Sequence, residues 1–329
     1  MIALLAPGQG AQSPGMLAPW LALTGAQERV AAWSEATGLD LRRLGTTADA
    51  EEIKDTAVTQ PLTVALSLLA AEELARRVDL PIEAPLAGHS VGELAAAAVA
   101  GVLTSDEAVA LAAVRGREMA TACALEPTGM SAVLGGDPED VTAMLARLGL
   151  DAANRNGTGQ VVAAGPLDAL AALAAHRPAG SRVRPLPVAG AFHTRFMAPA
   201  EHALARYAAQ LTAKDPARPL LSNADGEVVA EGAEMLRRMV AQVTRPLRWD
   251  SCMATLRTLA VTVTVELPPA GTLSSLVKRE LTSVGRDVMG VGRDVMGTVT
   301  LALKTPEDLD KVAGLVSAHS GTAHSGTVA

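Results

Sequence analysis

Short apolar runs that end at glycine or proline recur along the chain and predict the strands of a buried parallel sheet. One run covers residues 2–6 and ends at the sequence PGQG, and a second covers residues 85–87 and ends at Gly88. In a third, residues 261–265, valine alternates with threonine, and Glu266 follows. Strands of a parallel sheet are covered on both faces, which gives them this apolar character. With helical stretches between the runs, the pattern predicts an α/β domain.

Helical spacing of apolar residues connects these runs. Pro61 is predicted to begin one helix, because proline is favoured in the first turn. Thr104 and Glu107 form a capping box, which predicts a helix that reaches about residue 122. One face of that helix carries Ala108, Leu111, Ala112, Arg115 and Met119. This face is apolar except for the arginine, so we expect it to pack inward.

The segment 126–189 has a different order of elements. Strands are predicted at 130–134, 151–153, 160–164 and 182–188, and helices at 138–148 and 167–175. The order β-α-β-β-α-β is that of a ferredoxin-like unit. We therefore expect a small ferredoxin-like subdomain, 126–189, inserted into a large α/β domain made of residues 1–125 and 190–316.

Two stretches near the C-terminus are repetitive. The sequence VGRDVMG occurs twice in succession, at 284–290 and 291–297, and is interpreted as a duplication within a surface loop. The segment 317–329 contains HSGT twice, and its small polar residues predict a disordered tail. Two copies are too few for a repeat fold.

Composition narrows the class of protein. Apolar residues make up 49% of the 329-residue chain and charged residues 19%, which is typical of a globular protein with a sizeable core. No apolar run is long enough to span a membrane, and the N-terminus lacks the features of a signal peptide. The net charge of -7 argues against nucleic acid as a partner. Two cysteines allow no disulfide framework, and no Cys/His group has zinc spacing, so we expect a cytoplasmic protein without a metal.

The sequence Gly88-His89-Ser90-Val91-Gly92 lies between a predicted strand and a predicted helix. In that context G-x-S-x-G forms a nucleophile elbow, in which the serine hydroxyl is presented at the end of the strand. The following helix offers backbone N–H groups to an oxyanion. The alternative is a plain strand-to-helix turn that contains an ordinary serine.

A serine nucleophile needs a base, and the chain has six histidines. His89 is expected to pack beside the elbow, and His176 and His202 to be solvated. His319 and His324 fall in the predicted tail. His193, in a loop where the chain re-enters the large domain, is the remaining candidate. A lone loop histidine is more often structural, and elimination alone supports this one.

Arg115 on the inward helix face needs an anionic partner, because a buried unpaired charge is costly. It could form a structural ion pair, or its long stem could reach the surface. It could also clamp a substrate carboxylate. The residues alone leave these readings open.

Several motifs occur in an order that resembles malonyl-CoA:acyl-carrier-protein transacylases. They are GQGAQ from Gly8, GHSVGE from Gly88, Arg115 with Met119, NG at Asn156 with QVV from Gln160, and Phe192-His193. The resemblance covers the chain from Met1 to about Leu315. It implies an α/β-hydrolase-like large domain with the ferredoxin-like insertion.

The resemblance also implies roles for single residues. Ser90 would be the nucleophile and His193 the base, and the backbone N–H groups of Gln9 and Val91 would form the oxyanion hole. Gln242 occupies the place from which the family orients its histidine with a carbonyl group rather than a carboxylate. The substrate-binding residues would be Arg115, Met119, Asn156 and Phe192, and Arg115 would hold the malonyl carboxylate.

The implied reaction is ping-pong transfer of a malonyl group from malonyl-CoA to the phosphopantetheine thiol of holo acyl carrier protein, without a cofactor, by a monomer. One alternative is a serine esterase or thioesterase, which predicts a triad acid and no buried arginine. Another is a non-catalytic subunit that binds the carrier protein. An acidic carrier protein would need a basic patch, for which Arg155, Arg182, Arg184 and Arg195 are candidates. The sequence departs from the family at 267–271, after Glu266, where a Gly-Pro-Gly-like turn is usual, and at the duplication.

Overall fold

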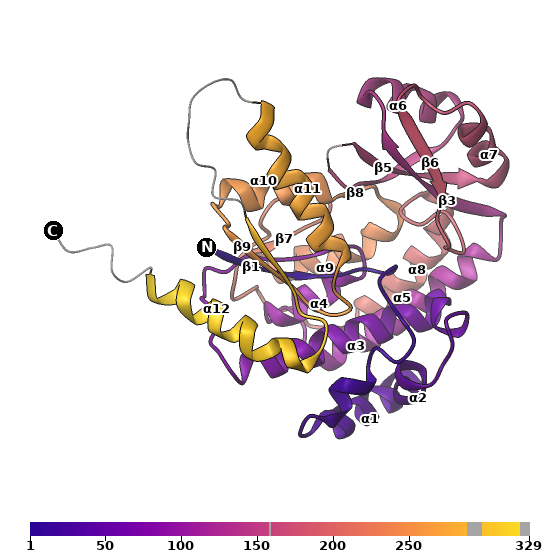
Figure 1. Ribbon diagram of the computed structural model, residues 1–329. Coiled ribbons are helices and arrows are strands. Elements are labelled where there is room, and N and C mark those ends of the chain that lie inside the picture. Colours follow the sequence, from indigo (N-terminus) through magenta and orange to yellow (C-terminus); the bar gives the residue numbers. More distant parts are fainter. Residues whose placement is uncertain (158, 288–297, 323–329) are drawn as a thin grey trace.

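The computed structural model describes residues 1–157, 159–287 and 298–322, and its centre is a five-stranded parallel sheet (Figure 1). The sheet order is β10-β9-β1-β2-β7. The strands are β1 (Ile2–Ala6), β2 (Leu86–Gly88), β7 (Leu220–Leu221), β9 (Val263–Glu266) and β10 (Val299–Ala302). The three apolar runs are therefore strands, as predicted, and β1 lies between β2 and β9.

Helices cover this sheet. In chain order they are α1 (Ala26–Thr37), α2 (Leu41–Thr46), α3 (Thr56–Ala75), α4 (Gly92–Val99), α5 (Ser105–Cys123), α8 (Ala198–Ala208), α9 (Gly232–Ala241), α10 (Trp249–Thr258), α11 (Thr272–Asp287) and α12 (Leu309–Thr322). Within the described residues, no helix is both long and apolar enough to cross a membrane.

Helix α5 has the start and the inward face that were predicted. The side chain of Thr104 accepts a hydrogen bond from the backbone N–H of Glu107, and the Glu107 side chain accepts one from the Thr104 N–H. The residues of the predicted face are all buried, and Arg115 is only 2% exposed. The face packs on α3, so the arginine is directed into the molecule.

The start predicted for α3 is wrong. The helix begins at Thr56, capped by the Asp55 side chain, and Pro61 lies inside it. Gly116 of α5 lies so close to this turn that an added Cβ would be 2.6 Å from the Thr56 carbonyl oxygen. This packing outweighs the local cost of a proline inside the helix. The first turn of α3 is thus in close contact with α5, and Gln60 becomes a helical residue that faces it.

The inserted segment forms a second sheet, above the large domain at the upper right of Figure 1. In chain order its elements are β3 (Thr128–Gly135), α6 (Pro138–Arg147), β4 (Asp151–Arg155), β5 (Gln160–Pro166), α7 (Leu167–Ala175) and β6 (Ser181–Pro185). The order β6-β3-β5-β4 with antiparallel pairing is the ferredoxin-like arrangement. An unpredicted strand, β8 (Leu247–Arg248), comes from the later part of the chain and pairs parallel with β4.

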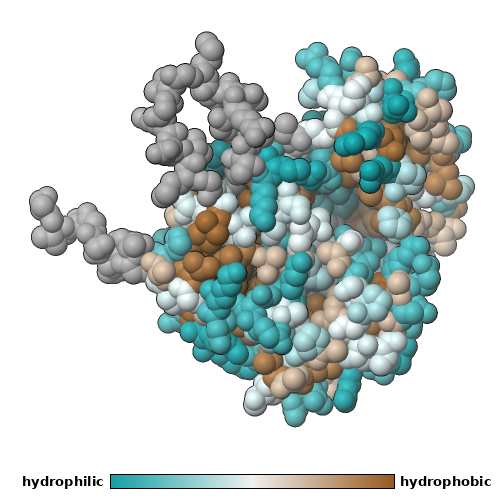
Figure 2. All heavy atoms as spheres, viewed as in Figure 1, coloured by the Kyte–Doolittle hydropathy of each residue, from teal (hydrophilic) through white to brown (hydrophobic). Residues whose placement is uncertain are grey.

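The two repetitive stretches differ in part from expectation. Helix α12 reaches Thr322, so residues 317–322 are helical rather than a disordered tail, and 323–329 lie outside the described residues. Helix α11 reaches Asp287 and includes the start of the VGRDVMG duplication, whose remainder at 288–297 also lies outside them. The predicted surface loop is thus partly helix. The surface is hollowed between the small subdomain and the large domain (Figure 2).

Candidate active site

Ser90 lies in the sharp turn between β2 and α4, which has the geometry of a nucleophile elbow. Its φ angle is 55°, a left-handed conformation that is unfavourable for serine. A Cβ on Gly88 would lie 2.1 Å from the Gly92 carbonyl carbon, and one on Gly92 would lie 2.3 Å from the Ala6 oxygen. Glycine is therefore required on both sides of the serine, because α4 begins in contact with β1 and β2.

His193 is the histidine that the fold brings to this serine. Its Nε2 lies 2.9 Å from the Ser90 Oγ, and its Nδ1 lies 2.8 Å from the backbone carbonyl oxygen of Gln242. A carbonyl oxygen can only accept, so Nδ1 carries the proton and Nε2 is free to accept from the serine hydroxyl. The Gln242 contact was predicted from a resemblance, and in the structure its backbone, not its side chain, holds the imidazole.

The environment of His193 keeps the imidazole neutral. Burial and the nearby charge of Arg115 lower the pKa of His193 to about 3, against the opposing effect of the hydrogen bond to Gln242. A neutral imidazole is the form that can take a proton from the serine.

Arg115 points at the serine from α5. One guanidinium nitrogen donates to the Gln242 Oε1 at 2.8 Å and lies 3.3 Å from the Ser90 Oγ, and the other donates to the Gln60 Oε1 at 2.7 Å. Burial lowers the pKa of Arg115 to about 10, which leaves it cationic at neutral pH. No ion pair to Arg115 is present within the described ranges, so the reading as a structural ion pair is not supported.

A cavity of about 90 Å³ joins these groups. It is lined by Gln9, Gln60, His89, Ser90, Val91, Arg115, Met119, Met130, Asn154, Leu186, Val188, Phe192 and His193. This is smaller than the usual pocket for a drug-sized ligand and suits a short acyl group. The backbone N–H groups of Gln9 and Val91 donate to no other described residue, which leaves both free for an oxyanion.

Asn156 lies differently from the other predicted residues. Its Oδ1 is 3.0 Å from the Nε2 of His89, and the His89 ring packs edge-on against Trp249. Asn154, two residues earlier, lines the cavity instead. A role for Asn156 in substrate binding stays a prediction, and its observed contact is with the buried His89.

Three polar residues of the site were missed by sequence reasoning. Gln60 accepts from Arg115, Asn223 accepts from the Ser90 N–H at 2.8 Å, and Glu93 is buried beside Gln242 and Asn223. Asn223 follows β7, and the carboxyl ends of parallel strands are where sites gather. That rule could have found it. Gln60 was hidden by the wrong start of α3.

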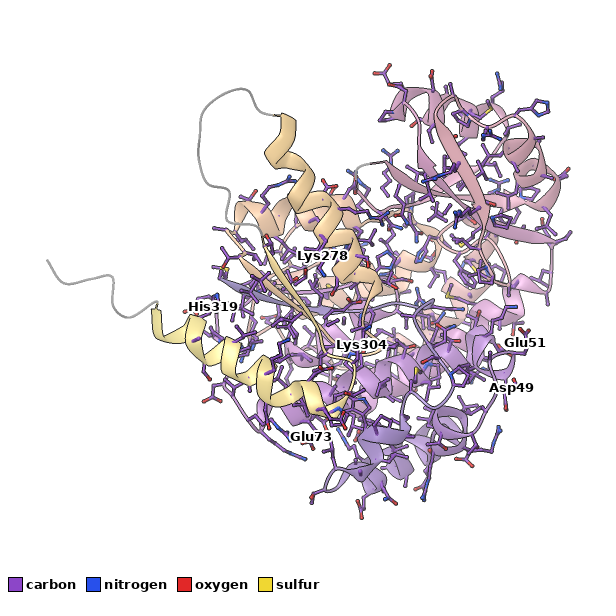
Figure 3. All side chains as sticks on the ribbon, in the orientation of Figure 1. Asp49, Glu51, Glu73, Lys278, Lys304 and His319 are labelled. Carbon is purple, nitrogen blue, oxygen red and sulfur yellow. The ribbon has the colours of Figure 1, made fainter. Side chains whose placement is uncertain are left out.

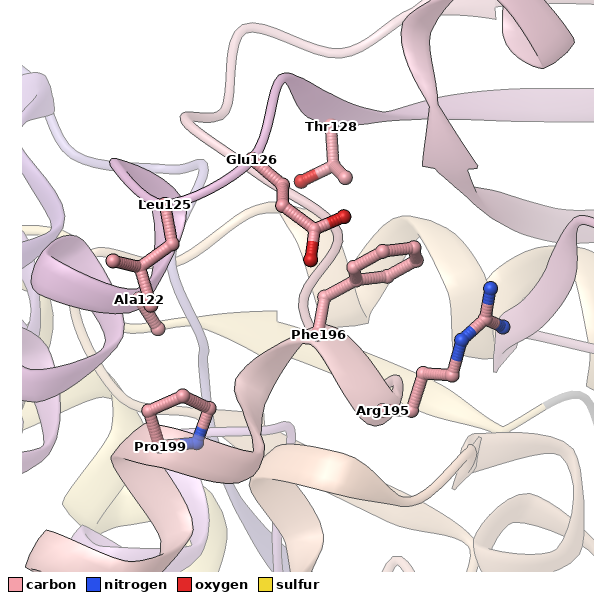
Figure 4. Close-up of a pocket in the computed structure, with 7 residues that line it drawn as sticks. All are labelled: Ala122, Leu125, Glu126, Thr128, Arg195, Phe196 and Pro199. Carbon is pink, nitrogen blue, oxygen red and sulfur yellow. The ribbon is translucent and has the colours of Figure 1, made fainter.

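A larger cavity, of about 240 Å³, lies beside the loop that follows His193 (Figure 4). It is lined by Ala122, Leu125, Glu126, Thr128, Arg195, Phe196 and Pro199. The Arg195 guanidinium stacks on the Phe196 ring at 4.6 Å. This cavity contains none of the residues that surround Ser90, so size alone does not mark the site. No group of metal ligands is found in the described part of the chain.

Comparisons with known proteins point to one family. Residues 4–313 match the acyl transferase domain family. The malonyl CoA-acyl carrier protein transacylase of Mycobacterium tuberculosis is 57% identical over 316 residues, which cover 96% of this chain and all of that protein. That of Salmonella typhimurium is 34% identical and covers 84% of this chain and 92% of its own. The crystal structure of MCAT from M. tuberculosis superposes with a TM-score of 0.87, covering 95% of this chain and 99% of that one.

The fold and the serine site therefore define an acyltransferase with an α/β-hydrolase-like large domain and a ferredoxin-like insertion. Within that class, the chain belongs to the malonyl-CoA:acyl-carrier-protein transacylase family.

Proposed function

We propose that the protein transfers a malonyl group from malonyl-CoA to the phosphopantetheine thiol of an acyl carrier protein, through a malonyl ester of Ser90. The observation that carries this proposal is the position of Arg115. Its guanidinium is buried 3.3 Å from the Ser90 Oγ, and among the described residues it is hydrogen-bonded only to neutral groups. A carboxylate at the far end of the acyl group would supply the missing anion.

The mechanism follows from the proton positions. His193 Nε2 accepts the Ser90 proton as Oγ attacks the thioester carbonyl carbon, and the N–H groups of Gln9 and Val91 hold the oxyanion. The C–S bond breaks, and the coenzyme A thiolate takes the proton from His193. The carrier-protein thiol then gives its proton to Nε2 and attacks the ester, and Ser90 leaves as its hydroxyl. The chemistry needs no metal or redox cofactor.

Two features count against the esterase alternative. The group that orients His193 is a backbone carbonyl and not a triad carboxylate, and a buried arginine lies in the site. The non-catalytic alternative is disfavoured because the serine and the histidine are in hydrogen-bonding contact. A monomer and a cytoplasmic location stay predictions.

The test is intact-protein mass spectrometry after brief exposure to malonyl-CoA. We expect a stable malonyl adduct that disappears when holo acyl carrier protein is added and malonyl carrier protein appears. Rapid release of malonate without a stable adduct would support the hydrolase instead, and no change in mass would support the non-catalytic subunit.

Arg115→Ala is expected to reverse the acyl preference. A hydrogen bond to a charged group contributes about 1.5–3 kcal/mol, so malonyl transfer should fall roughly 10–150-fold. Transfer of the uncharged acetyl group should be kept or should rise. The measurement is kcat/KM for malonyl-CoA and acetyl-CoA. Arg117→Ala on the same helix, where the side chain is 60% exposed, is the matched control. An equal loss for both thioesters would make Arg115 structural.

Phe192→Ser is expected to relax discrimination against methylmalonyl-CoA. The Phe192 ring is buried in the wall of the 90 Å³ cavity, where it would meet an α-methyl group. Exclusion of one methyl group is typically worth about 1–3 kcal/mol, or roughly 10–200-fold. The ratio of kcat/KM for the two thioesters should therefore move toward unity. Phe196→Ser, which changes the chain's other phenylalanine in the cavity of Figure 4, is the control. A proportional loss on both substrates would show that the ring only packs.

The four arginines proposed to dock the carrier protein do not form one patch. Across the sheet, Arg184 is in register with Ala132, Val162 and Asn154, so their side chains lie on the same face. Arg182 lies on that face too, two residues before Arg184 on the same strand. Asn154 lines the cavity from this face. Arg155 is in register with Val161 and lies on the opposite face. The guanidinium of Arg195 forms an ion pair with Asp151, with 3.6 Å between Nη1 and Oδ2. We retain Arg182 and Arg184 as the docking candidates.

Replacing Arg182 and Arg184 together by glutamate is expected to raise the KM for carrier protein severalfold, because reversed rim charges slow the encounter with an acidic partner. Formation of the malonyl adduct should be unchanged. Arg155→Glu is the control on the other face of the sheet. A KM that responds neither to the double variant nor to salt would reject this surface.

A further inference from the structure

Glu93 is a buried acidic residue beside Ser90 that the mechanism above does not use. It is the second residue of α4 and is 1% exposed. One carboxyl oxygen accepts the backbone N–H of Asn223, and the other accepts the Nε2 of Gln242. In its carboxylate form Glu93 accepts through both oxygens, and both donors belong to residues that touch the reacting groups.

Through Asn223, Glu93 is connected by hydrogen bonds to the serine elbow. The Asn223 Oδ1 accepts the Ser90 N–H at 2.8 Å, and its Nδ2 donates to the Gly88 carbonyl oxygen at 2.7 Å. These two bonds hold the backbone that leads from the end of β2 into the strained serine conformation. Asn223 is completely buried, so water does not compete for them.

Through Gln242, Glu93 is connected by hydrogen bonds to Arg115. The amide of Gln242 has one accepting end and one donating end. Its Nε2 donates to Glu93 and lies 3.2 Å from the Ser90 carbonyl oxygen, so its Oε1 is left to face Arg115 at 2.8 Å. If the amide were reversed, its NH₂ would face the guanidinium, and two donors would oppose each other. The Glu93 carboxyl group makes the shortest of the three contacts that keep this end of Gln242 away from Arg115, beside the Ser90 carbonyl oxygen and the Asn223 Oδ1.

We infer that Glu93 is a positioning residue of the transfer site, which acts through Gln242 on Arg115 and through Asn223 on Ser90. Its effect should be larger for malonyl than for acetyl, because only the malonyl carboxylate uses Arg115. The inference rests on the proposed function in that respect. The charged groups that act on Glu93 are Arg115 and Arg238.

The test is Glu93→Gln, assayed in mildly alkaline buffer because burial raises the pKa of the carboxyl group. A glutamine that accepts from Asn223 with its oxygen presents NH₂ to the NH₂ of Gln242, so the Gln242 amide should turn over. We expect the KM for malonyl-CoA to rise and the malonyl-to-acetyl ratio of kcat/KM to fall about 10-fold, the effect of losing one hydrogen bond to a charged group.

Glu73→Gln is the matched control. Glu73, in the last turn of α3, is another buried glutamate, 6% exposed, and it pairs with Arg76 and Arg77, which follow that helix, near α12 and away from the site (Figure 3). Its replacement should lower the melting temperature without changing the ratio. A folded Glu93→Gln enzyme with the wild-type ratio would overturn the inference. Such a result would not affect the proposed function if the wild-type enzyme forms the malonyl adduct.

A second variant, Gln242→Met, tests the inference by itself if Glu93→Gln does not fold, and in combination with Glu93→Gln if that variant folds. Gln242→Met removes the amide but keeps the backbone carbonyl that holds His193. It should lower the malonyl-to-acetyl ratio by itself, and adding Glu93→Gln to it should lower the ratio no further, since the two changes break one chain of contacts. An unchanged ratio in Gln242→Met, or fully additive losses in the pair, would overturn the inference.

Discussion

Ser90→Ala is expected to abolish both the malonyl adduct and transfer to the carrier protein. In the proposed mechanism the hydroxyl oxygen forms the ester, and no other side chain that lines the cavity can replace it. Removing a serine nucleophile costs up to about 10⁶-fold in related chemistry, so the remaining rate should be close to background. Alanine carries the same Cβ as serine, so the elbow and the fold should persist. The measurements are intact mass after exposure to malonyl-CoA and the rate of carrier-protein acylation.

The cysteines provide the outcome that would contradict this assignment. Burial raises the pKa of Cys123 to about 11, so its thiol is largely protonated and a weak nucleophile at neutral pH. Cys252 is completely buried, and burial raises its pKa as well. We therefore expect no adduct on either residue. A malonyl adduct that persists in Ser90→Ala and maps to Cys123 would mean that the nucleophile is misassigned.

The parts of the fold predicted correctly are those whose signals are local. The elbow depends on five consecutive residues and the strand before them, and the start of α5 depends on Thr104 and Glu107. The ferredoxin-like unit follows from the order of six short elements. In each case the physical cause of the structure lies within a few residues of its position in the chain.

The parts that were missed depend on contacts between distant segments. The first turn of α3 is helical in spite of Pro61 because α5 packs against it, and β8 exists only because β4 offers it an edge. The network around Glu93 joins residues that are 130 and 149 positions apart in the chain. A buried polar residue of this kind has no periodicity that sets it apart until its partners are known.

His193 and Arg115 show the same limit within the site. Elimination selected His193, and the resemblance assigned its role, but neither could show that its Nε2 would lie 2.9 Å from the Ser90 Oγ. The spacing on α5 predicted that Arg115 faces inward and left its partner open. Only the absence of a carboxylate at hydrogen-bonding distance, among the residues that the structure describes, separates a substrate clamp from an internal ion pair.

His193→Ala is expected to slow acylation by about 10²–10⁴-fold, the usual contribution of general-base assistance. The oxyanion N–H groups and Arg115 are untouched by the change, so malonyl-CoA should still bind. The measurement is the single-turnover rate of adduct formation, with KM for malonyl-CoA as the control. His202→Ala, an exposed histidine on α8, should have no effect. An unchanged acylation rate in His193→Ala would remove it from the mechanism.

The pH dependence of the wild type tests the same assignment without a mutation. The imidazole is a base only when it is neutral, and its pKa in the free enzyme is lowered to about 3 from an ordinary value of 6.5. As pH falls, the neutral imidazole therefore persists well below 6.5, so its own titration should cause no decline in kcat/KM for acylation near that pH. A bound malonyl carboxylate offsets the Arg115 charge that helps to lower this pKa. The acid limb of kcat should thus lie at higher pH than the acid limb of kcat/KM for malonyl-CoA, because kcat reports the complex and kcat/KM the free enzyme.

Acetyl-CoA is the control substrate. Its acyl group carries no such charge, so the acid limbs of its kcat and kcat/KM should lie closer together. Identical limbs for both substrates near pH 6.5 would mean that the base is a solvated histidine rather than His193.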